Sequence, residues 1–369
     1  MSKTKIETNR SPSAGAESSH LKTIGAGLLI TISTVLIFLF LLEAAAHVLN
    51  YQKHGRWRGS CLHYEPALGW DLAGDCRLKA KTLIDSDGVA YKVDYRTNKL
   101  GSRLWGDQPS QRLKLMLVGD SFTDAQEVSN EKTYFAHLEN ELDVDVFAYG
   151  VGGYGTLQQW LKTKELLEHV YPDIYILQFC SNDFENNSMA SEAMSVVESQ
   201  KTRPYWQESQ IHYAYPPNGL YSRLLRASLA FRFLDGRLQR LRYAWNDNDY
   251  YSQAHREELL QRRPQDVSIT ADLLRRLSAD LPRSTKRFAF NCQPETGSKR
   301  NETDARDFHM IAEQAGFEVI EGVAAHARDT GLSEQVATTA ADNAHLNERG
   351  HALWGHYLAR FLQNRLSML

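Results

Sequence analysis

From residue 114 onwards, short apolar runs alternate with longer stretches of helical period, and this alternation limits the possible fold more than any other feature. The first run predicts a short buried strand, Lys114-Leu115-Met116-Leu117-Val118, because it is apolar and ends in a β-branched residue. Further strands are predicted over 144–149, 173–179, 287–291 and 317–320, and helices over 156–169 and 347–366. Strands separated by helices indicate an α/β fold with a mainly parallel sheet covered on both faces.

The composition is that of a folded protein without general affinity for nucleic acid. A chain of 369 residues can form one large domain or two small ones, and 42% hydrophobic residues are enough for a full core. The net charge is -3, and no basic cluster with interleaved aromatic residues is present, which argues against a nucleic-acid partner. No CxxC or HExxH pattern indicates a zinc site.

The N-terminal region contains an uncharged apolar stretch, Thr23 to Leu42. About 20 such residues at about 1.5 Å each cross the hydrocarbon core of about 30 Å, so we predict a transmembrane helix over 23–48 after a disordered cytoplasmic tail over 1–22. The alternative is a cleaved signal peptide, since Ala44-Ala45-Ala46 resembles a cleavage site. The stretch exceeds the usual apolar region of about 7–15 residues in signal peptides, and this length favours an uncleaved single-pass anchor.

Charge on the two sides of the apolar stretch indicates its orientation. The basic residues of the N-terminal side are Lys3, Lys5, Arg10 and Lys22, and those of the other side are Lys53, Arg56 and Arg58. This slight bias favours an N-terminus inside, with the C-terminal domain on the extracytoplasmic (periplasmic) side. In an oxidising compartment Cys61 and Cys76 could pair. Cys180 and Cys292 fall within apolar, strand-like segments, so we expect them to be buried thiols.

Two regions flank or interrupt the alternating pattern. Residues 49–110 form a lead-in with an extra β element, since Tyr91 to Tyr95 alternates like a strand. Residues 111–369 form the main α/β domain, with an insertion at about 184–285. The aromatic residues of the insertion could contact a saccharide or a lipid, or could simply belong to the core.

Within the insertion, Leu220 to Tyr243 mixes leucine and phenylalanine with six arginines. One interpretation is a membrane-surface helix or a substrate lid. The other is an ordinary helix with its apolar face on the core and its arginines in water. We favour the ordinary helix, because such stripes are the rule for helices of globular proteins.

The residues after the first strand suggest a nucleophile. Gly119 ends this strand, and Asp120 and Ser121 open what is predicted to be a helix. A serine at such a turn exposes its hydroxyl at the C-terminal edge of the sheet, and its own N–H, at a helix start, can face a developing oxyanion. The alternative is that Ser121 only caps the helix.

A serine nucleophile needs a base and a group that orients the base. Both are present in Asp342-Asn343-Ala344-His345, just before the final helix. A spacing of three residues places both side chains on one side of a turn or a first helical turn. Asp342 could then accept the Nδ1–H of His345 and leave Nε2 to take the proton of Ser121.

Oxyanion donors follow the neighbouring strands. Gly153 lies in the glycine-rich turn after the second strand, where the absence of a Cβ lets the backbone approach a ligand. Asn182 follows the third strand, and its neutral side-chain amide can donate a hydrogen bond. With the N–H of Ser121, these groups all lie just past a strand's C-terminal end, where open α/β sheets bind ligands.

These motifs together resemble the SGNH (GDSL-type) hydrolase family of esterases, of the membrane-anchored bacterial kind. The four matching blocks are Gly119-Asp120-Ser121, Gly153, Asn182-Asp183 and Asp342-x-x-His345. The resemblance implies a flavodoxin-like three-layer α/β/α sandwich with no metal or organic cofactor. It implies that Ser121 is the nucleophile, His345 the base and Asp342 its orienter. Gly153, Asn182 and the N–H of Ser121 would stabilise the oxyanion.

One position departs from the family pattern. The third block usually has glycine two residues before the asparagine, and here that residue is Cys180. A larger side chain there is expected to narrow the pocket, so the substrate is not carried over from the family.

The resemblance favours a membrane-anchored serine esterase that acts on an acyl ester. This ester could be an acylated saccharide or a lipid. One alternative is an O-acetyltransferase that modifies an envelope polysaccharide. Another is a non-catalytic carbohydrate-binding protein of the same fold, which the complete set of catalytic residues argues against.

Overall fold

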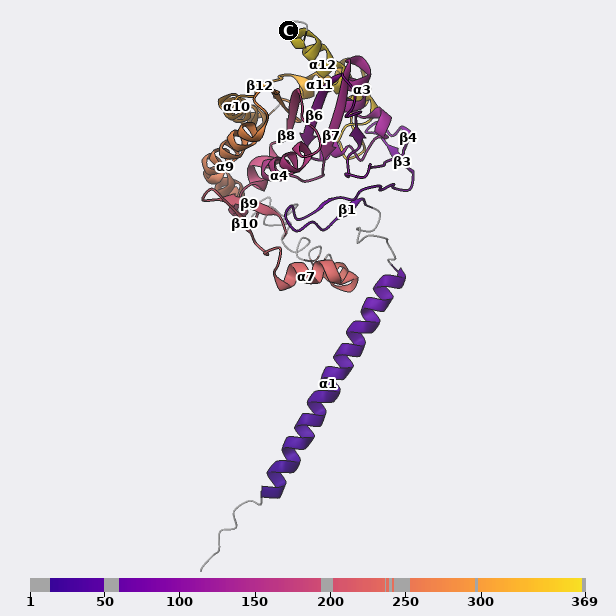
Figure 1. The fold of residues 1–369 in the computed structure, drawn as a ribbon, viewed down its shortest axis with the longest axis vertical. Helices are drawn as coiled ribbons and strands as arrows, with labels where there is room; N and C mark the ends of the chain where they lie inside the picture. The colour runs from indigo at the N-terminus through magenta and orange to yellow at the C-terminus, as the bar shows by residue number, and fades with distance from the viewer. Residues whose placement is uncertain are drawn as a thin grey trace, which may run out of the picture.

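The fold is described from a computed structural model. It describes residues 14–49, 60–193, 202–235, 237, 238, 241, 253–295 and 298–366. The chain has a long N-terminal helix, α1, that stands apart from an α/β domain (Figure 1).

A six-stranded sheet forms the centre of the domain. Its strands are β5 (Leu104–Trp105), β6 (Leu113–Gly119), β7 (Val144–Gly150), β8 (Ile174–Phe179), β11 (Lys286–Asn291) and β12 (Glu318–Val319). The spatial order is β12-β11-β8-β6-β7-β5, and every pair is parallel except β5 with β7. Counted along the chain from β6, the five parallel strands have the order 2-1-3-4-5, which is that of flavodoxin-like sheets. The predicted fold class is therefore confirmed.

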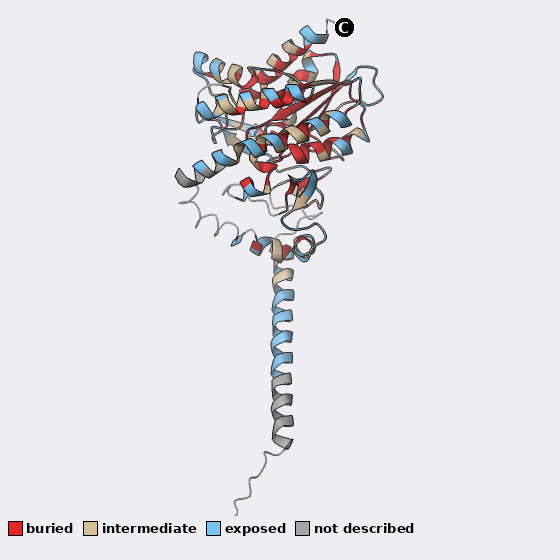
Figure 2. Cartoon of the chain, turned by 90° about the vertical axis from the view of Figure 1, so that its left-hand side faces the viewer, coloured by how far each residue is buried: buried red, intermediate tan, exposed pale blue. Residues whose placement is uncertain are grey.

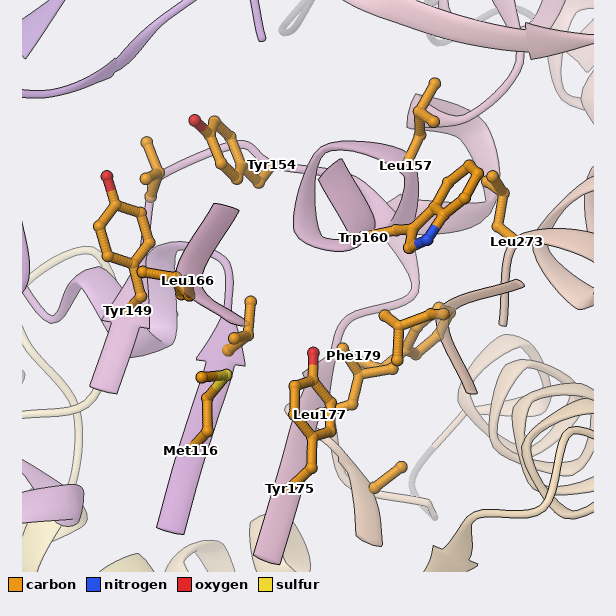
Figure 3. Packing of buried hydrophobic residues seen from close by; sticks show 14 of the residues in the cluster. Met116, Tyr149, Tyr154, Leu157, Trp160, Leu166, Tyr175, Leu177, Phe179 and Leu273 are labelled. Atoms are coloured by element: carbon orange, nitrogen blue, oxygen red, sulfur yellow. The ribbon is translucent and has the colours of Figure 1, made fainter. Parts of the chain in front are cut away.

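Helices cover both faces of the sheet. One face carries α3 (Tyr134–Glu141), α11 (Val323–Glu334) and α12 (Glu348–Leu366), and the other carries α4 (Thr156–Leu167), α9 (Gln253–Asp280) and α10 (Lys299–Gln314). Each strand contributes buried side chains to both faces of the sheet, because successive side chains point to opposite sides. Thus Met116 packs in the α4 layer and Leu117 in the α12 layer, and both are fully buried. Figure 3 shows the α4 layer, where Trp160 lies next to Leu273 of α9.

The lead-in also contributes to the sheet. Its elements are β1 (Leu62–His63), β2 (Asp71–Leu72), β3 (Lys81–Ile84), β4 (Ala90–Val93) and β5. β1 pairs with β2 and β3 with β4, each antiparallel, whereas β5 adds an antiparallel edge strand beside β7. The predicted extra β element is thus built from two small ribbons and one strand of the main sheet.

The insertion has several short elements and one long helix. They are α5 (Asn182–Asn186), α6 (Met189–Glu192), the hairpin β9 (Pro204–Gln207) and β10 (Gln210–Tyr213), α7 (Leu220–Ala227) and α9. The last part of α9 buries Leu273, Leu274 and Leu277 in the core. It therefore acts as the crossover helix between β8 and β11 rather than as a separate appendage.

Helix α1 spans Ala14–Leu49, so residues 14–22, which we predicted as disordered tail, are helical. Its stretch Ala26–Val48 is long and apolar enough to cross a membrane, and none of it is buried against the domain (Figure 2). The helix starts earlier than predicted because its first turns contain good helix formers, such as Ala14, Ala16 and Glu17. Residues 1–13 lie outside the described part of the chain.

The four cysteines form two disulfides. Cys61 pairs with Cys76 across 5.8 Å between Cα atoms, and Cys180 pairs with Cys292 across 5.2 Å. The prediction that Cys180 and Cys292 are buried thiols is wrong. They directly follow β8 and β11, which are neighbours in register Phe179↔Asn291, so the next residues lie side by side.

Candidate active site

Ser121 is the first residue of the short helix α2 (Ser121–Asp124), which is separated from the end of β6 only by Asp120. The helix is capped by Asp120, whose carboxylate accepts the N–H of Phe122 at 3.1 Å. Ser121 is therefore not the cap, and its N–H is among the first four of the helix, which have no partner within it. The turn needs glycine before it, because a Cβ at Gly119 would lie 2.2 Å from the hydroxyl of Thr123.

The side chains of Ser121, His345 and Asp342 form a continuous hydrogen-bonded chain. The Nε2 atom of His345 lies 3.0 Å from the Oγ of Ser121. The Nδ1 atom of His345 lies 2.6 Å from Oδ2 of Asp342. When Asp342 accepts the Nδ1–H, Nε2 is left unprotonated and faces the serine hydroxyl, which is the arrangement of a nucleophile, a base and an orienting group.

His345 and Asp342 belong to a tight turn between α11 and α12. One carboxylate oxygen of Asp342 accepts the N–H groups of Ala344 and His345, each at 3.0 Å, so the aspartate builds the turn as well as holding the imidazole. Asn343 takes the left-handed conformation that this turn requires, with φ of 56°. On its other side the imidazole lies 5.2 Å from the ring of Phe122, which packs on Trp354.

The turn after β7 presents Gly153 with φ of 77°, a conformation that favours glycine. Two groups hold this turn. The N–H of Gly152 donates to the carboxylate of Asp124 at 3.2 Å, and the carbonyl of Gly152 accepts the indole N–H of Trp70 at 3.0 Å. In a trans peptide the carbonyl and the next N–H point in opposite directions. The contact with Trp70 therefore fixes the direction of the N–H of Gly153.

Asn182 opens α5, shortly after β8. Its side-chain amide donates to Oδ1 of Asn186 at 2.9 Å, which leaves the second N–H of the amide for another acceptor. The hydroxyl of Thr156, at the start of α4, donates to Asp183 at 2.9 Å and ties α5 to the helix that follows the Gly153 turn.

The predicted site residues thus fall into two groups. Ser121, Asp342 and His345 are in direct contact. Gly153 and Asn182 lie at the ends of the two strands that flank β6 in the sheet. All of them lie at the C-terminal edge of the parallel strands, beside the point where the strand order reverses.

Comparison with known families agrees with this geometry. Residues 115–206 match the family of GDSL-like lipases and acylhydrolases. The match covers about a quarter of the chain, and it indicates an ester-bond hydrolase. The matched segment contains Ser121, Gly153 and Asn182, and the Asp342–His345 turn lies beyond it. No curated protein sequence matches the chain.

Solved structures include similar GDSL-like and other esterases. The psychrotrophic esterase EstA from Pseudoalteromonas sp. is 11% identical, with 69% of this chain and 98% of that chain covered and a TM-score of 0.39. A catalytic mutant of Axe2, an acetylxylan esterase from Geobacillus stearothermophilus, is 13% identical, with 68% and 94% covered and a TM-score of 0.38.

The electrostatics of this GDSL-like site favour a charged imidazole at moderately low pH. Burial alone lowers the pKa of His345, but the carboxylates of Glu127 and Asp342 outweigh it and raise this pKa above its usual value of 6.5. Partial burial acts to raise the pKa of Asp342, yet its hydrogen bonds from His345 and Ala344 hold it below the usual range. Asp342 is therefore ionised wherever the imidazole titrates.

Sequence reasoning missed three residues that contact the site. Trp70 and Asp124 hold the Gly152 turn, and Glu127 is the second carboxylate beside His345. Burial raises the pKa of Asp124 in spite of its bonds from Tyr95 and the backbone. Asp124 and Glu127 follow Ser121 closely in the chain, so their position in the sequence could have pointed to them. Nothing in the sequence links Trp70 to the site, because it lies in the lead-in, far before Ser121.

The site has few features of a metal centre. Glu127, Asp342 and His345 bring one ligand atom each within 4.8 Å of one another. Both ring nitrogens of His345 already have partners, Asp342 and Ser121, so the imidazole has no free position for an ion. A separate hollow beside α10, lined by residues such as Asn291 and His309, contains none of the site residues.

Cys180 stands where the family usually has glycine. Its side chain is 1% exposed and packs in the core with Cys292, to which it is bonded. The disulfide fixes the end of β8 two residues before Asn182.

Proposed function

We propose that the protein is a single-pass, membrane-anchored serine esterase that hydrolyses a carboxylic ester through an acyl-enzyme on Ser121. The observation that supports this most directly is the hydrogen-bonded chain from Ser121 through His345 to Asp342, at 3.0 and 2.6 Å. Without a base at hydrogen-bond distance, a serine hydroxyl is a weak nucleophile at neutral pH.

The chemistry follows from these positions. Nε2 of His345 takes the proton of Ser121 as Oγ attacks the ester carbonyl, and Asp342 stabilises the imidazolium that forms. The N–H groups of Ser121 and Gly153 and the amide of Asn182 stabilise the oxyanion. When the tetrahedral intermediate collapses, His345 gives its proton to the leaving alcohol. A water molecule, deprotonated by His345, then releases the acyl group and restores Ser121.

The proposed location rests on α1 and on the disulfides. The stretch Ala26–Val48 satisfies the length of a membrane span, and its N-terminal flank has slightly more positive charge. Both disulfides belong to the part of the chain that follows the span, and disulfides persist in oxidising compartments. We therefore propose that the catalytic domain lies on the extracytoplasmic side.

The catalytic proposal is tested with the full chain in detergent and a small chromogenic acetyl ester. Ser121→Ala should abolish turnover and labelling by a serine-directed phosphonate while the melting temperature stays unchanged. Ser333→Ala is the matched control, since Ser333 is exposed at the end of α11, and it should keep full activity. Unchanged turnover in Ser121→Ala would refute the nucleophile. Addition of a sugar acceptor separates hydrolysis from transfer, because transfer that outpaces hydrolysis would make the protein an acyltransferase.

The location is tested with one introduced thiol. No native cysteine is free, so Leu332→Cys, at a position 72% exposed on the domain, gives a single reactive site. A membrane-impermeant maleimide should label it in intact cells with a permeable outer envelope. Labelling only after lysis would place the domain in the cytoplasm.

A further inference from the structure

We propose that α7 and the helical residues after it form a foot that lies on the surface of the lipid bilayer and holds the catalytic domain against it. The foot comprises residues 220–235 with 237, 238 and 241. This inference rests on the membrane anchor of the proposed function, and it adds a second, peripheral contact with lipid to the span itself.

The foot is attached to the end of the proposed span. Glu43, in the last turns of α1, accepts the hydroxyl of Ser228 at 2.5 Å and the N–H groups of Leu229 and Ala230 at 2.8 and 3.2 Å. Ser228 interrupts the amphipathic stretch, so the carboxylate caps the helical residues that follow the break. Figures 1 and 2 both place α7 at the C-terminal end of α1, where the span would leave the membrane.

The two halves of the foot are tied to each other. The hydroxyl of Tyr221 in α7 donates to Asp235 at 2.9 Å, and its ring packs edge-on against Phe231. These contacts fix the shape of the foot, and they thereby determine which side chains lie on its outer face.

The outer face of the foot carries exposed apolar side chains. Leu234, Leu238 and Leu241 are 45%, 63% and 64% exposed, and a spacing of four and then three residues places them on one side of a helix. Phe233 beside them is 58% exposed. The ordinary helix that we favoured, with its apolar stripe on the core, is therefore wrong for Leu234, Leu238 and Leu241, although Leu229 at the start of this half is buried.

The charge of the foot matches an anionic lipid surface. The stretch from Leu220 to Tyr243 has six arginines and one aspartate, in a chain whose net charge is -3. Three of these arginines, Arg223, Arg226 and Arg237, are exposed beside the apolar side chains. Leucine with arginine along one helix is the composition of helices that lie in the headgroup region, and basic residues there attract anionic lipids.

Lipid is the occupant that the structure favours, because Glu43 joins this apolar and basic foot to the end of a span that lipid would surround. The experiment uses the full chain in vesicles of phosphatidylethanolamine and phosphatidylglycerol. Leu238→Cys is labelled with an environment-sensitive dye, and quenching by lipids with a nitroxide near the headgroup is measured. Leu332→Cys, on the domain away from the foot, is the matched control, and Leu36→Cys reports on the span.

The expected result is quenching at position 238 several-fold greater than at position 332, together with quenching at position 36 by deeply placed nitroxides. Quenching at 36 with none at 238 would overturn the foot and leave the anchor intact. Quenching at neither would refute the anchor on which the foot depends. A dye at 238 that is shielded from aqueous iodide but not quenched by lipid would show that protein, such as a second copy of this chain, covers this face.

Discussion

The two sides of Ser121 are held in different ways. On the base side, Asp342 and His345 share one short turn, and the side chain of Asp342 is 45% exposed. On the oxyanion side, the Gly152 turn is held by Asp124 and Trp70, which are 28 and 82 residues away in the chain. Both of these are buried.

The two sides differ in whether their contacts lie within one turn or join segments that are distant in the chain. On the base side, the contact between Asp342 and His345 is made within one turn, although the segment before this turn also touches the lead-in, where the N–H of Ala341 donates to the carbonyl of Ile84 at 3.2 Å. The oxyanion side depends on the lead-in, which is itself fixed to the domain by Asp71: that carboxylate accepts the hydroxyl of Tyr154 at 3.1 Å and pairs with Lys162 at 2.9 Å. Substitutions far from Ser121 should therefore affect transition-state stabilisation more often than they affect the base.

The largest effect is expected on the base side. Among the residues that the structure describes, His345 is the one group found at hydrogen-bond distance that can take the proton of Ser121, so His345→Ala should lower kcat by about 10⁴–10⁶-fold. The rate of acetyl-ester hydrolysis by the full chain measures this. His309→Ala, on α10, should change it little, and a His345→Ala variant with comparable activity would show that another group is the base.

Asn182→Ala should have the next largest effect, on the oxyanion side. Loss of one donor to the oxyanion typically lowers kcat by about 10²–10³-fold, and KM should change much less. Asn364→Ala, near the exposed end of α12, is the control for loss of an asparagine. A fall in kcat/KM that comes only from KM would mean that Asn182 binds the substrate and does not stabilise the oxyanion.

Trp70→Phe tests whether the lead-in sets the direction of the Gly153 N–H. The ring that packs against Tyr154 is largely kept, but the donor to the carbonyl of Gly152 is lost. We expect kcat to fall by about 10-fold, less than for loss of a whole donor, because the turn is still held by Asp124. Trp105→Phe, in the edge strand β5, should leave kcat unchanged. Equal effects of the two substitutions would indicate a general loss of packing.

The same contrast explains what the sequence could predict. The contact of His345 with Asp342 follows from a spacing of three residues, and the mainly parallel sheet follows from the alternation of strands and helices. The hydrogen bond from Trp70 to Gly152 could not be predicted, because no local sequence pattern links a tryptophan of the lead-in to the turn after the second predicted strand. The roles of the predicted site residues stay predictions until the variants above are measured.

The disulfide of Cys180 and the foot were missed for a related reason. Two cysteines 112 residues apart meet only because β8 and β11 are neighbours, and the strand order was needed to see this. The apolar stripe after Ser228 looks like any core-facing helix in sequence. Whether leucines such as Leu238 face a core or the solvent depends on what the rest of the fold leaves uncovered.

The smallest effect is expected from Glu127→Gln, and it concerns pH. The carboxylate of Glu127 helps to raise the pKa of His345, so its removal should lower that pKa. Since the neutral imidazole is the proposed base, activity should rise with pH as His345 loses its proton, and this acid limb of the kcat/KM profile should move to lower pH in the variant. When kcat/KM is divided by its own plateau value at high pH, the variant should therefore be a few-fold more active than the parent at acidic pH. Glu131→Gln, nearby but 60% exposed, should leave the limb in place. A limb that stays or moves to higher pH in Glu127→Gln would contradict the contribution of Glu127 to the raised pKa of His345.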